Sequence, residues 1–217
     1  MKQYKGIVFD LDGTLLNTIQ DLADSVNYVL AYYGYSEHGY EDYKLKIGKG
    51  FQHLLEMSLP KDRQSDAMME KALDMFVKAY AKRYLNKTAP YKGIEAMLEK
   101  LQEKGIKMGV NSNKRNDYSS ALIKKNFPQI SFVGIFGERE DVPRKPNPQA
   151  ALELVGLMNL KPEEVLYMGD SQIDMETGKN AGMDTIGVLW GFRKEDELIE
   201  GGAAYIVKAP EEVTALF

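Results

Sequence analysis

The sequence has no cysteine and only two histidines, His38 and His53, among its 217 residues. Thiol catalysis, disulfide bonds and thiolate metal sites are therefore excluded, and two imidazoles argue against a histidine-rich metal site. No apolar run approaches about 18 residues, and the start of the sequence has no basic segment followed by a long apolar one. We therefore expect no membrane span, no signal peptide and a cytoplasmic location.

A strong excess of one charge is also missing. The sequence has 28 Lys and Arg against 32 Asp and Glu, which gives a formal net charge of −4 and a pI of ≈ 5.4. This balance argues against a general binder of nucleic acid or of an anionic membrane surface, but a small anionic substrate responds to local charge. The hydrophobic content of 44% is ordinary for a soluble globular protein. A chain of this length can form one full domain, or a core with a smaller insertion.

The first apolar run, Ile7–Phe9, predicts a short buried strand that ends at two carboxylates, Asp10 and Asp12. Gly13 then marks a turn. In open α/β sheets, ligands bind outside the carboxyl ends of the strands. A pair of acids there can supply a nucleophile, a general acid/base or ligands for a hard cation. Taken alone, the segment is equally typical of a solvated loop.

A helical block follows the first strand. Apolar residues recur at helical spacing from Ile19 to Leu30, and the helical character continues to about Leu85 with little that resembles a strand. We interpret residues 16–88 as a small inserted α-helical domain. Residues 1–15 and 89–217 would then form the core domain, with Pro90 marking the return to it.

From Pro90 onward, strands alternate with helices. The predicted strands are 106–110, 132–136, 165–168, 185–189 and 204–207. The predicted helices are 93–104, 117–126, 149–158, one that ends near 182, and 195–199. Such alternation is typical of βαβ units. The predicted fold class is therefore α/β, with a Rossmann-like, mostly parallel sheet as its core.

Four polar clusters follow predicted strands or stand in the loop after one. They are Asp10 with Asp12, Ser112 with Asn113, Lys145, and Asp170 with Asp174. Because the carboxyl ends of parallel strands meet at one edge of a sheet, we expect these residues to converge. Asp170 and Asp174 are four apart, which would place them on one helix face. Together with Asp10 they would make an all-oxygen site suited to Mg²⁺.

This set of side chains provides what phosphoryl transfer needs. Asp10 could attack phosphorus and form an aspartyl-phosphate, while Asp12 could protonate the leaving oxygen and later activate water. Lys145 could hold the phosphate and shield the anionic nucleophile from an anionic substrate. Ser112 and the backbone N–H of Asn113 could bind the transferring oxygens.

In this order, four motifs resemble the haloacid dehalogenase-like hydrolase superfamily. They are Phe9-Asp10-Leu11-Asp12-Gly13-Thr14, Asn111-Ser112-Asn113, Lys145-Pro146 and Gly169-Asp170-Ser171-Gln172-Ile173-Asp174. The resemblance covers nearly the whole chain, and the helical insertion resembles that superfamily's type-1 cap. It implies a phosphatase with Mg²⁺ as cofactor and a small phosphorylated metabolite as substrate. It also implies that Asp10, the main-chain carbonyl of Asp12 and Asp170 ligate the metal, with Asp174 acting through water or as an orienting residue.

Within the superfamily, the segment from Gly187 to Arg193, the later Ala203-Ala204-Tyr205-Ile206 and the pair Asn113-Lys114 resemble the phosphoglycolate phosphatase group. Lys49, between two glycines in the helical block, is a candidate contact for a remote anionic group of the substrate, or else an exposed lysine in a turn. Lys114 is a second candidate contact, or else part of a solvated helix start.

Three alternatives remain open. A β-phosphoglucomutase-type phosphomutase would carry an arginine- and serine-bearing cap loop, which residues 47–51 do not reproduce. An inorganic pyrophosphatase would share the same reacting centre. A non-catalytic binding module would be expected to lose Asp10, Asp12 or Lys145, all of which are present. We expect no nucleic-acid or membrane partner, and a monomer or weak homodimer.

Overall fold

The computed structural model describes residues 3–217, and its centre is a six-stranded sheet in the order β5-β4-β1-β6-β7-β8. The strands are β1 (Gly6–Phe9), β4 (Lys107–Arg115), β5 (Gly134–Glu138), β6 (Val165–Gly169), β7 (Asp184–Val188) and β8 (Tyr205–Val207). Every neighbouring pair in this sheet is parallel. The predicted α/β fold with a mostly parallel sheet is confirmed.

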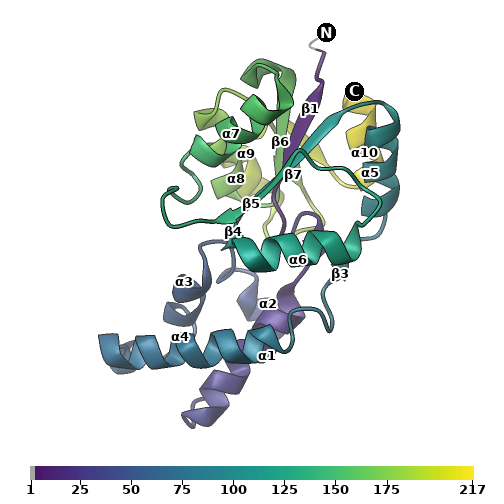
Figure 1. Ribbon diagram of the computed structural model, residues 1–217. Coiled ribbons are helices and arrows are strands. Elements are labelled where there is room, and N and C mark those ends of the chain that lie inside the picture. Colours follow the sequence, from purple (N-terminus) through teal and green to yellow (C-terminus); the bar gives the residue numbers. More distant parts are fainter. Residues whose placement is uncertain (1–2) are drawn as a thin grey trace.

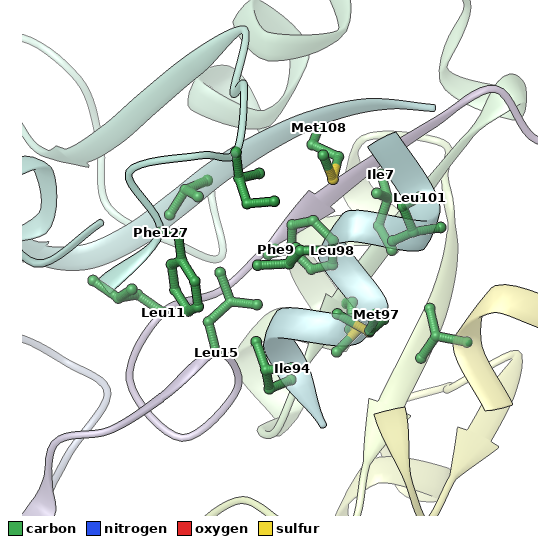
Figure 2. Close-up of a cluster of buried hydrophobic side chains, with 14 of the residues drawn as sticks. Ile7, Phe9, Leu11, Leu15, Ile94, Met97, Leu98, Leu101, Met108 and Phe127 are labelled. Atoms are coloured by element: carbon green, nitrogen blue, oxygen red, sulfur yellow. The ribbon is translucent and has the colours of Figure 1, made fainter. Parts of the chain in front are cut away.

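Helices cover both faces of the sheet (Figure 1). One face carries α5 (Ile94–Glu103), α6 (Asn116–Asn126) and α10 (Pro210–Val213), and the other carries α7 (Gln149–Met158), α8 (Gln172–Asn180) and α9 (Glu195–Glu200). Strand β1 shows why both faces must be covered. Ile7 and Phe9 point into the cluster beneath α5, as Figure 2 shows, whereas Val8 joins the cluster beneath α7. All three side chains are fully buried, each contributing about 1.5–3 kcal/mol to folding.

The helical block lies beyond one end of the sheet (Figure 1). It consists of α1 (Ile19–Tyr32), α2 (Tyr40–Tyr43), α3 (Phe51–Glu56) and α4 (Asp66–Ala81), and no strand lies between residues 19 and 85. These helices enclose an apolar cluster of their own, which Tyr118 and Phe192 of the sheet-bearing part complete. Across residues 3–217, none of the helices combines the length and the apolar character that crossing a membrane requires.

Two chain crossings join the helical block to the rest of the chain, and they lie side by side. Strands β2 (Leu16–Asn17) and β3 (Ala89–Pro90) form a two-residue antiparallel ladder that the sequence pattern did not predict. Next to it, the buried Asp21 carboxylate accepts hydrogen bonds from the N–H groups of Lys87 and Thr88 and from the Thr88 hydroxyl, at 2.8–3.1 Å. The division into domains at residues 16 and 88 stays a prediction.

Strand β4 differs most from its predicted bounds. The prediction ended at Val110, whereas the strand continues through the polar residues up to Arg115 and pairs with β5 across a register shift. Residues 111–114 are all buried, and Ser112, Asn113 and Lys114 line the pocket described next, so their polarity did not mark a loop.

Candidate active site

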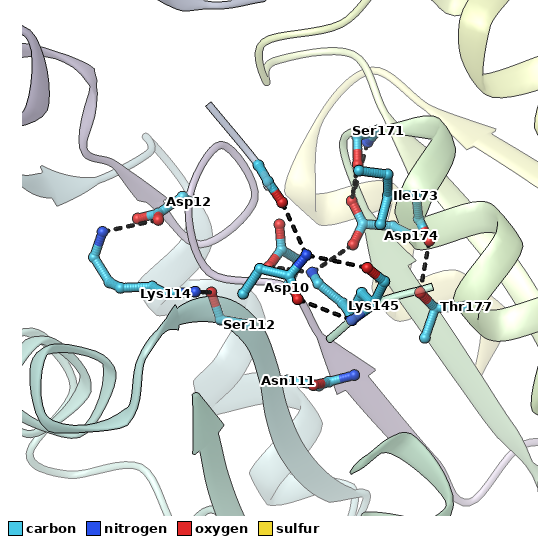
Figure 3. A network of polar contacts seen from close by, with 12 residues as sticks. Asp10, Asp12, Asn111, Ser112, Lys114, Lys145, Ser171, Ile173, Asp174 and Thr177 are labelled. Atoms are coloured by element: carbon cyan, nitrogen blue, oxygen red, sulfur yellow. Dashed lines mark hydrogen bonds and ion pairs between the residues drawn. The ribbon is translucent and has the colours of Figure 1, made fainter. Parts of the chain in front are cut away.

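Three adjacent central strands bring polar side chains to the same edge of the sheet. Asp10 follows β1, Ser112 lies in β4, and Asp170 follows β6, with β1 in the middle. The carboxylates of Asp10, Asp170 and Asp174 each offer an oxygen, and these oxygens lie within 4.8 Å of one another. The predicted convergence of the acids at the carboxyl edge of the sheet is present in the structure, and Figure 3 shows part of this network.

Lys145 supplies the cation inside this acid cluster. It stands in the loop before α7, and its ammonium donates to Asp10 Oδ1 and to Asp174 Oδ1, both at 2.7 Å (Figure 3). All three side chains are almost completely buried. Lys145 therefore offsets charge on two of the three acids at once.

Asp174 is held on both of its oxygens. While Oδ1 meets Lys145, Oδ2 accepts from the backbone N–H and the hydroxyl of Ser171, at 3.1 and 2.6 Å, in the first turn of α8. Asp170 precedes this helix in the bend after β6, so the expectation that Asp170 and Asp174 share a helix face is wrong. The bend, rather than helical periodicity, brings the two carboxylates together.

The clustering changes the protonation of these groups. Burial and the neighbouring Asp174 carboxylate raise the pKa of Asp10 to about 7, although Lys145 acts in the opposite direction. Burial, Asp174 and Asp10 likewise raise the pKa of Asp170 well above its usual value. Burial lowers the pKa of Lys145, but the facing carboxylates outweigh it and the net pKa is raised. The raised pKa values of Asp10 and Asp170 show that one ammonium does not balance three carboxylates, and a divalent cation at this all-oxygen donor set would favour their ionised forms, which fits Mg²⁺.

Two glycines allow the acids to approach so closely. Gly13 has φ of 89°, and a Cβ at this position would lie 2.4 Å from Asp170 Oδ2. A Cβ on Gly169 would lie 2.2 Å from Asp174 Cβ. Both distances are far below a van der Waals contact, so any larger residue at either position would displace a carboxylate of the site.

Asp12 stands apart from the triad and pairs with Lys114. Its Oδ2 lies 2.8 Å from the Lys114 ammonium, while its buried Oδ1 has no hydrogen-bond partner among residues 3–217. The Lys114 side chain is 1% exposed and lies against the rings of Phe51 and Tyr80, 5.7 and 5.1 Å from their centroids. Lys114 therefore does not belong to a solvated helix start.

A pocket of ≈ 540 Å³, its open mouth included, connects these groups. The sheet-bearing part contributes the acids Asp10, Asp12 and Asp170 with Ser112, Asn113, Lys114 and Lys145, and the helical block contributes Ile47, Gly48, Gly50, Phe51 and Leu54. Lys49 is different: it is exposed and lines a separate outer groove with His53 and Glu176. The structure thus brings together all the predicted site residues except Lys49.

Sequence reasoning missed the side chains that hold the helical block over the pocket. Arg193, after β7, donates to the carbonyl oxygen of Ile47 at 3.0 Å and to that of Lys44. Arg144 donates to the carbonyl oxygen of Lys49 at 3.3 Å. Main-chain acceptors leave no signal in a sequence, so no residue pattern could have identified these contacts.

Comparisons with known proteins agree with this geometry. A family model for haloacid dehalogenase-like hydrolases matches residues 7–188. The chain is 34% identical to a phosphoglycolate phosphatase of Aquifex aeolicus, over 87% of this chain and 86% of that protein. It is 30% identical to a phosphoglycolate phosphatase of Pseudomonas putida, over 86% of this chain and 70% of that protein. A crystal structure of a candidate phosphoglycolate phosphatase from Lactobacillus delbrueckii subsp. bulgaricus matches with a TM-score of 0.91 and 31% identity, covering 99% of each chain. The chain therefore belongs to the haloacid dehalogenase-like hydrolases, as a phosphoglycolate phosphatase-like enzyme that hydrolyses phosphoric monoesters.

Proposed function

We propose that the enzyme is a Mg²⁺-dependent phosphatase that hydrolyses a small phosphoglycolate-like monoester through an aspartyl-phosphate on Asp10. The observation that carries this proposal is the triad of Asp10, Asp170 and Asp174, whose oxygens lie within 4.8 Å of one another, with Lys145 against two of them. This arrangement combines a nucleophilic carboxylate, a cation site and a fixed ammonium in one buried place.

Asp10 and Asp170 would hold Mg²⁺, together with the main-chain carbonyl of Asp12. Both oxygens of Asp174 already accept hydrogen bonds, from Lys145 and Ser171, so Asp174 suits a role through water or as an orienting residue. When bound, Mg²⁺ supplies positive charge that stabilises the phosphoryl oxygens in the transition state.

In the first step, a carboxylate oxygen of Asp10 attacks phosphorus in line, and the bond from phosphorus to the leaving oxygen breaks. The protonated carboxyl of Asp12 gives its proton to that leaving oxygen. Lys145, Ser112 and the N–H of Asn113 stabilise the equatorial oxygens of the transferring group. The product of this step is an alcohol and phosphorylated Asp10.

In the second step, Asp12, now ionised, takes a proton from a water molecule. The water oxygen attacks phosphorus, the bond from phosphorus to Asp10 breaks, and inorganic phosphate leaves. Asp10 is again a carboxylate and Asp12 is again protonated, so the cycle closes. The unpartnered Oδ1 of Asp12 favours this role, because a buried carboxylate oxygen without a partner is open to an exchangeable proton.

The pocket also favours an anionic leaving group. Lys114 lies 2.8 Å from Asp12, so its ammonium stands next to the place where the leaving oxygen departs. A carboxylate on the leaving group, as in glycolate, would find its counter-charge there. The phosphoglycolate phosphatases similar to this chain are consistent with such a substrate.

The test is phosphate release from a panel of substrates, with Mg²⁺ and with a chelator. The panel contains 2-phosphoglycolate, β-glucose 1-phosphate, pyrophosphate and a generic aryl phosphate. The proposal predicts Mg²⁺-dependent release, fastest from 2-phosphoglycolate. Equal release in chelator, preferred cleavage of pyrophosphate, or conversion of β-glucose 1-phosphate into glucose 6-phosphate would contradict it.

A further inference from the structure

The side chain of Asn113 connects two separate parts of the site. Its Oδ1 accepts from the N–H of Lys145 at 2.9 Å, and its Nδ2 donates to the carbonyl oxygens of Gly48 at 2.9 Å and of Lys145 at 3.3 Å. An N–H requires an acceptor and a carbonyl requires a donor, so these partners fix which end of the amide is oxygen. Asn113 is 5% exposed, and both ends of its amide are engaged.

The first connection is to residues 44–50, which we call the covering loop. This loop joins α2 to α3 and contributes Ile47, Gly48 and Gly50 to the pocket wall. Side chains of the sheet-bearing part donate hydrogen bonds to the main-chain carbonyls of this loop. Asn113 donates to Gly48 and Arg144 donates to Lys49. Arg193 donates to both Lys44 and Ile47. The covering loop is thus held by contacts to its main chain, in addition to the buried side chain of Ile47.

The second connection is to Lys145. The Asn113 amide binds both the N–H and the carbonyl of this one residue, which fixes its main chain as a neighbouring strand would. The Lys145 side chain extends from there to Asp10 and Asp174, 2.7 Å from each. A lysine side chain is long and flexible, so a fixed main chain matters for the position of its ammonium.

We propose that Asn113 is a positioning residue that makes the placement of Lys145 depend on the seated covering loop. The inference rests on the proposed role of Lys145 at the transferring phosphoryl group. When the loop departs, the amide loses Gly48 and is left with an unpaired donor, which is unfavourable in a buried place. The amide then loosens, and the main chain of Lys145 loosens with it. The cationic part of the site is complete only when the pocket is covered, which couples closure to chemistry.

Arg144 offers a matched control. It contacts the same loop one residue further on, at the Lys49 carbonyl, but its guanidinium also pairs with Glu138 and its side chain is 41% exposed. Within residues 3–217 it forms no hydrogen bond to Asn113 or to the triad of Asp10, Asp170 and Asp174. Arg144→Met therefore removes a loop contact without touching the amide of Asn113.

The first measurements use the resting protein. Trypsin cleaves at lysines, and Lys46 and Lys49 of the covering loop report how often the loop leaves its seat. We expect Asn113→Ala to speed cleavage there about tenfold and to speed hydrogen exchange at the Lys145 amide by at least as much. Arg144→Met should speed cleavage by less than about threefold and leave exchange at Lys145 unchanged. Wild-type exchange at Lys145 in Asn113→Ala would overturn the inference.

The kinetic measurement separates an effect on the position of Lys145 from an effect on the anchoring of the covering loop alone. We expect Asn113→Ala to lower kcat about tenfold or more while KM changes less than about threefold, and Arg144→Met to leave kcat unchanged. Equal kinetic effects of the two variants would overturn the inference. The measurements on the resting protein need no activity, so they distinguish a failure of this inference from a failure of the proposed function.

A second variant covers the case in which Asn113→Ala does not fold. Asn113→Asp keeps an acceptor for the Lys145 N–H and removes the donor to Gly48. It also removes the donor to the Lys145 carbonyl. The variant should speed tryptic cleavage of the covering loop, and exchange at the Lys145 amide should rise with it, though by less than in Asn113→Ala because the acceptor for this amide is kept. Unchanged cleavage in this variant would contradict the assigned contact to Gly48.

Discussion

The ammonium of Lys145 lies 2.7 Å from Asp10, although 135 residues separate the two in sequence. The contact joins the loop before α7 to the end of β1, and a second contact of the same length continues it to Asp174. The protein thus places a buried cation directly against its candidate nucleophile. This pair determines both the stability of the resting site and the charge that an incoming phosphate meets.

Removing this cation should destabilise the protein. In chelator, we expect Lys145→Met to lower the free energy of unfolding by about 3 kcal/mol, because buried carboxylates would lose their direct counter-charge. Urea unfolding at neutral pH measures the effect. Lys5→Met is the control, since Lys5 forms an exposed pair with Glu164 at 2.6 Å whose loss should cost less than about 1 kcal/mol. Equal losses in the two variants would contradict the account of the acid cluster.

The raised pKa of Asp10 predicts a pH dependence of stability. Its value of about 7 in the folded protein lies above the ordinary 3.8, so folding favours the protonated carboxyl. In chelator, this contribution to stability is fully present below about pH 4 and is lost as the pH rises to about 7. Asp10→Asn cannot ionise at this position, so its free energy of unfolding should vary less over this window and exceed that of the wild type at pH 8. Parallel pH profiles of the two proteins would refute the prediction.

Asp21 should stabilise the connection between the helical block and the core. Asp21→Ala leaves the N–H groups of Lys87 and Thr88 and the Thr88 hydroxyl without their acceptor, and we expect a loss of about 3 kcal/mol. Asp24→Ala is the matched control on the same helix, because its pair with the Lys87 ammonium is exposed and worth less than about 1 kcal/mol. Thermal and urea unfolding give both values. Similar losses for both variants would argue against this role of Asp21.

Gly169 should be essential for the geometry of the site. In Gly169→Ala the new methyl group would press on Asp174, so we expect a fall in kcat of about 100-fold or more. Gly156→Ala, in α7, is the control: nothing lies within 4 Å of its Cβ position, and alanine favours helix, so activity should be unchanged. Steady-state phosphatase assays compare the two, and wild-type activity in Gly169→Ala would show that Asp174 tolerates displacement.

The sequence predicted those parts of the site that depend on topology. Asp10, Ser112 and Asp170 follow apolar runs, and parallel strands bring such positions to one edge whatever the details of the loops. The spacing of Asp170 and Asp174 predicts a shared helix face, which is wrong because Asp170 precedes α8 and the two carboxylates meet across the bend after β6, where Gly169 leaves room for Asp174.

The covering loop could not be predicted from the sequence. Lys49 is a cation between two glycines, a pattern that favours a substrate contact, yet it lines the outer groove and its carbonyl accepts from Arg144. Arg193 and the amide of Asn113 act through main-chain partners, which any residue type provides. Contacts of this kind depend on tertiary structure alone.

The most direct test of the central claim is to trap the phosphorylated enzyme. Wild-type enzyme is mixed with Mg²⁺ and 2-phosphoglycolate, quenched in acid within the first turnover, and mapped by peptide mass spectrometry, with Asp10→Asn as the control. The account predicts a phosphoryl group on Asp10 in the wild type, no phosphoenzyme in Asp10→Asn, and no turnover by that variant although it is folded. Phosphate release without any phosphorylation of Asp10, or appreciable activity in Asp10→Asn, would contradict it.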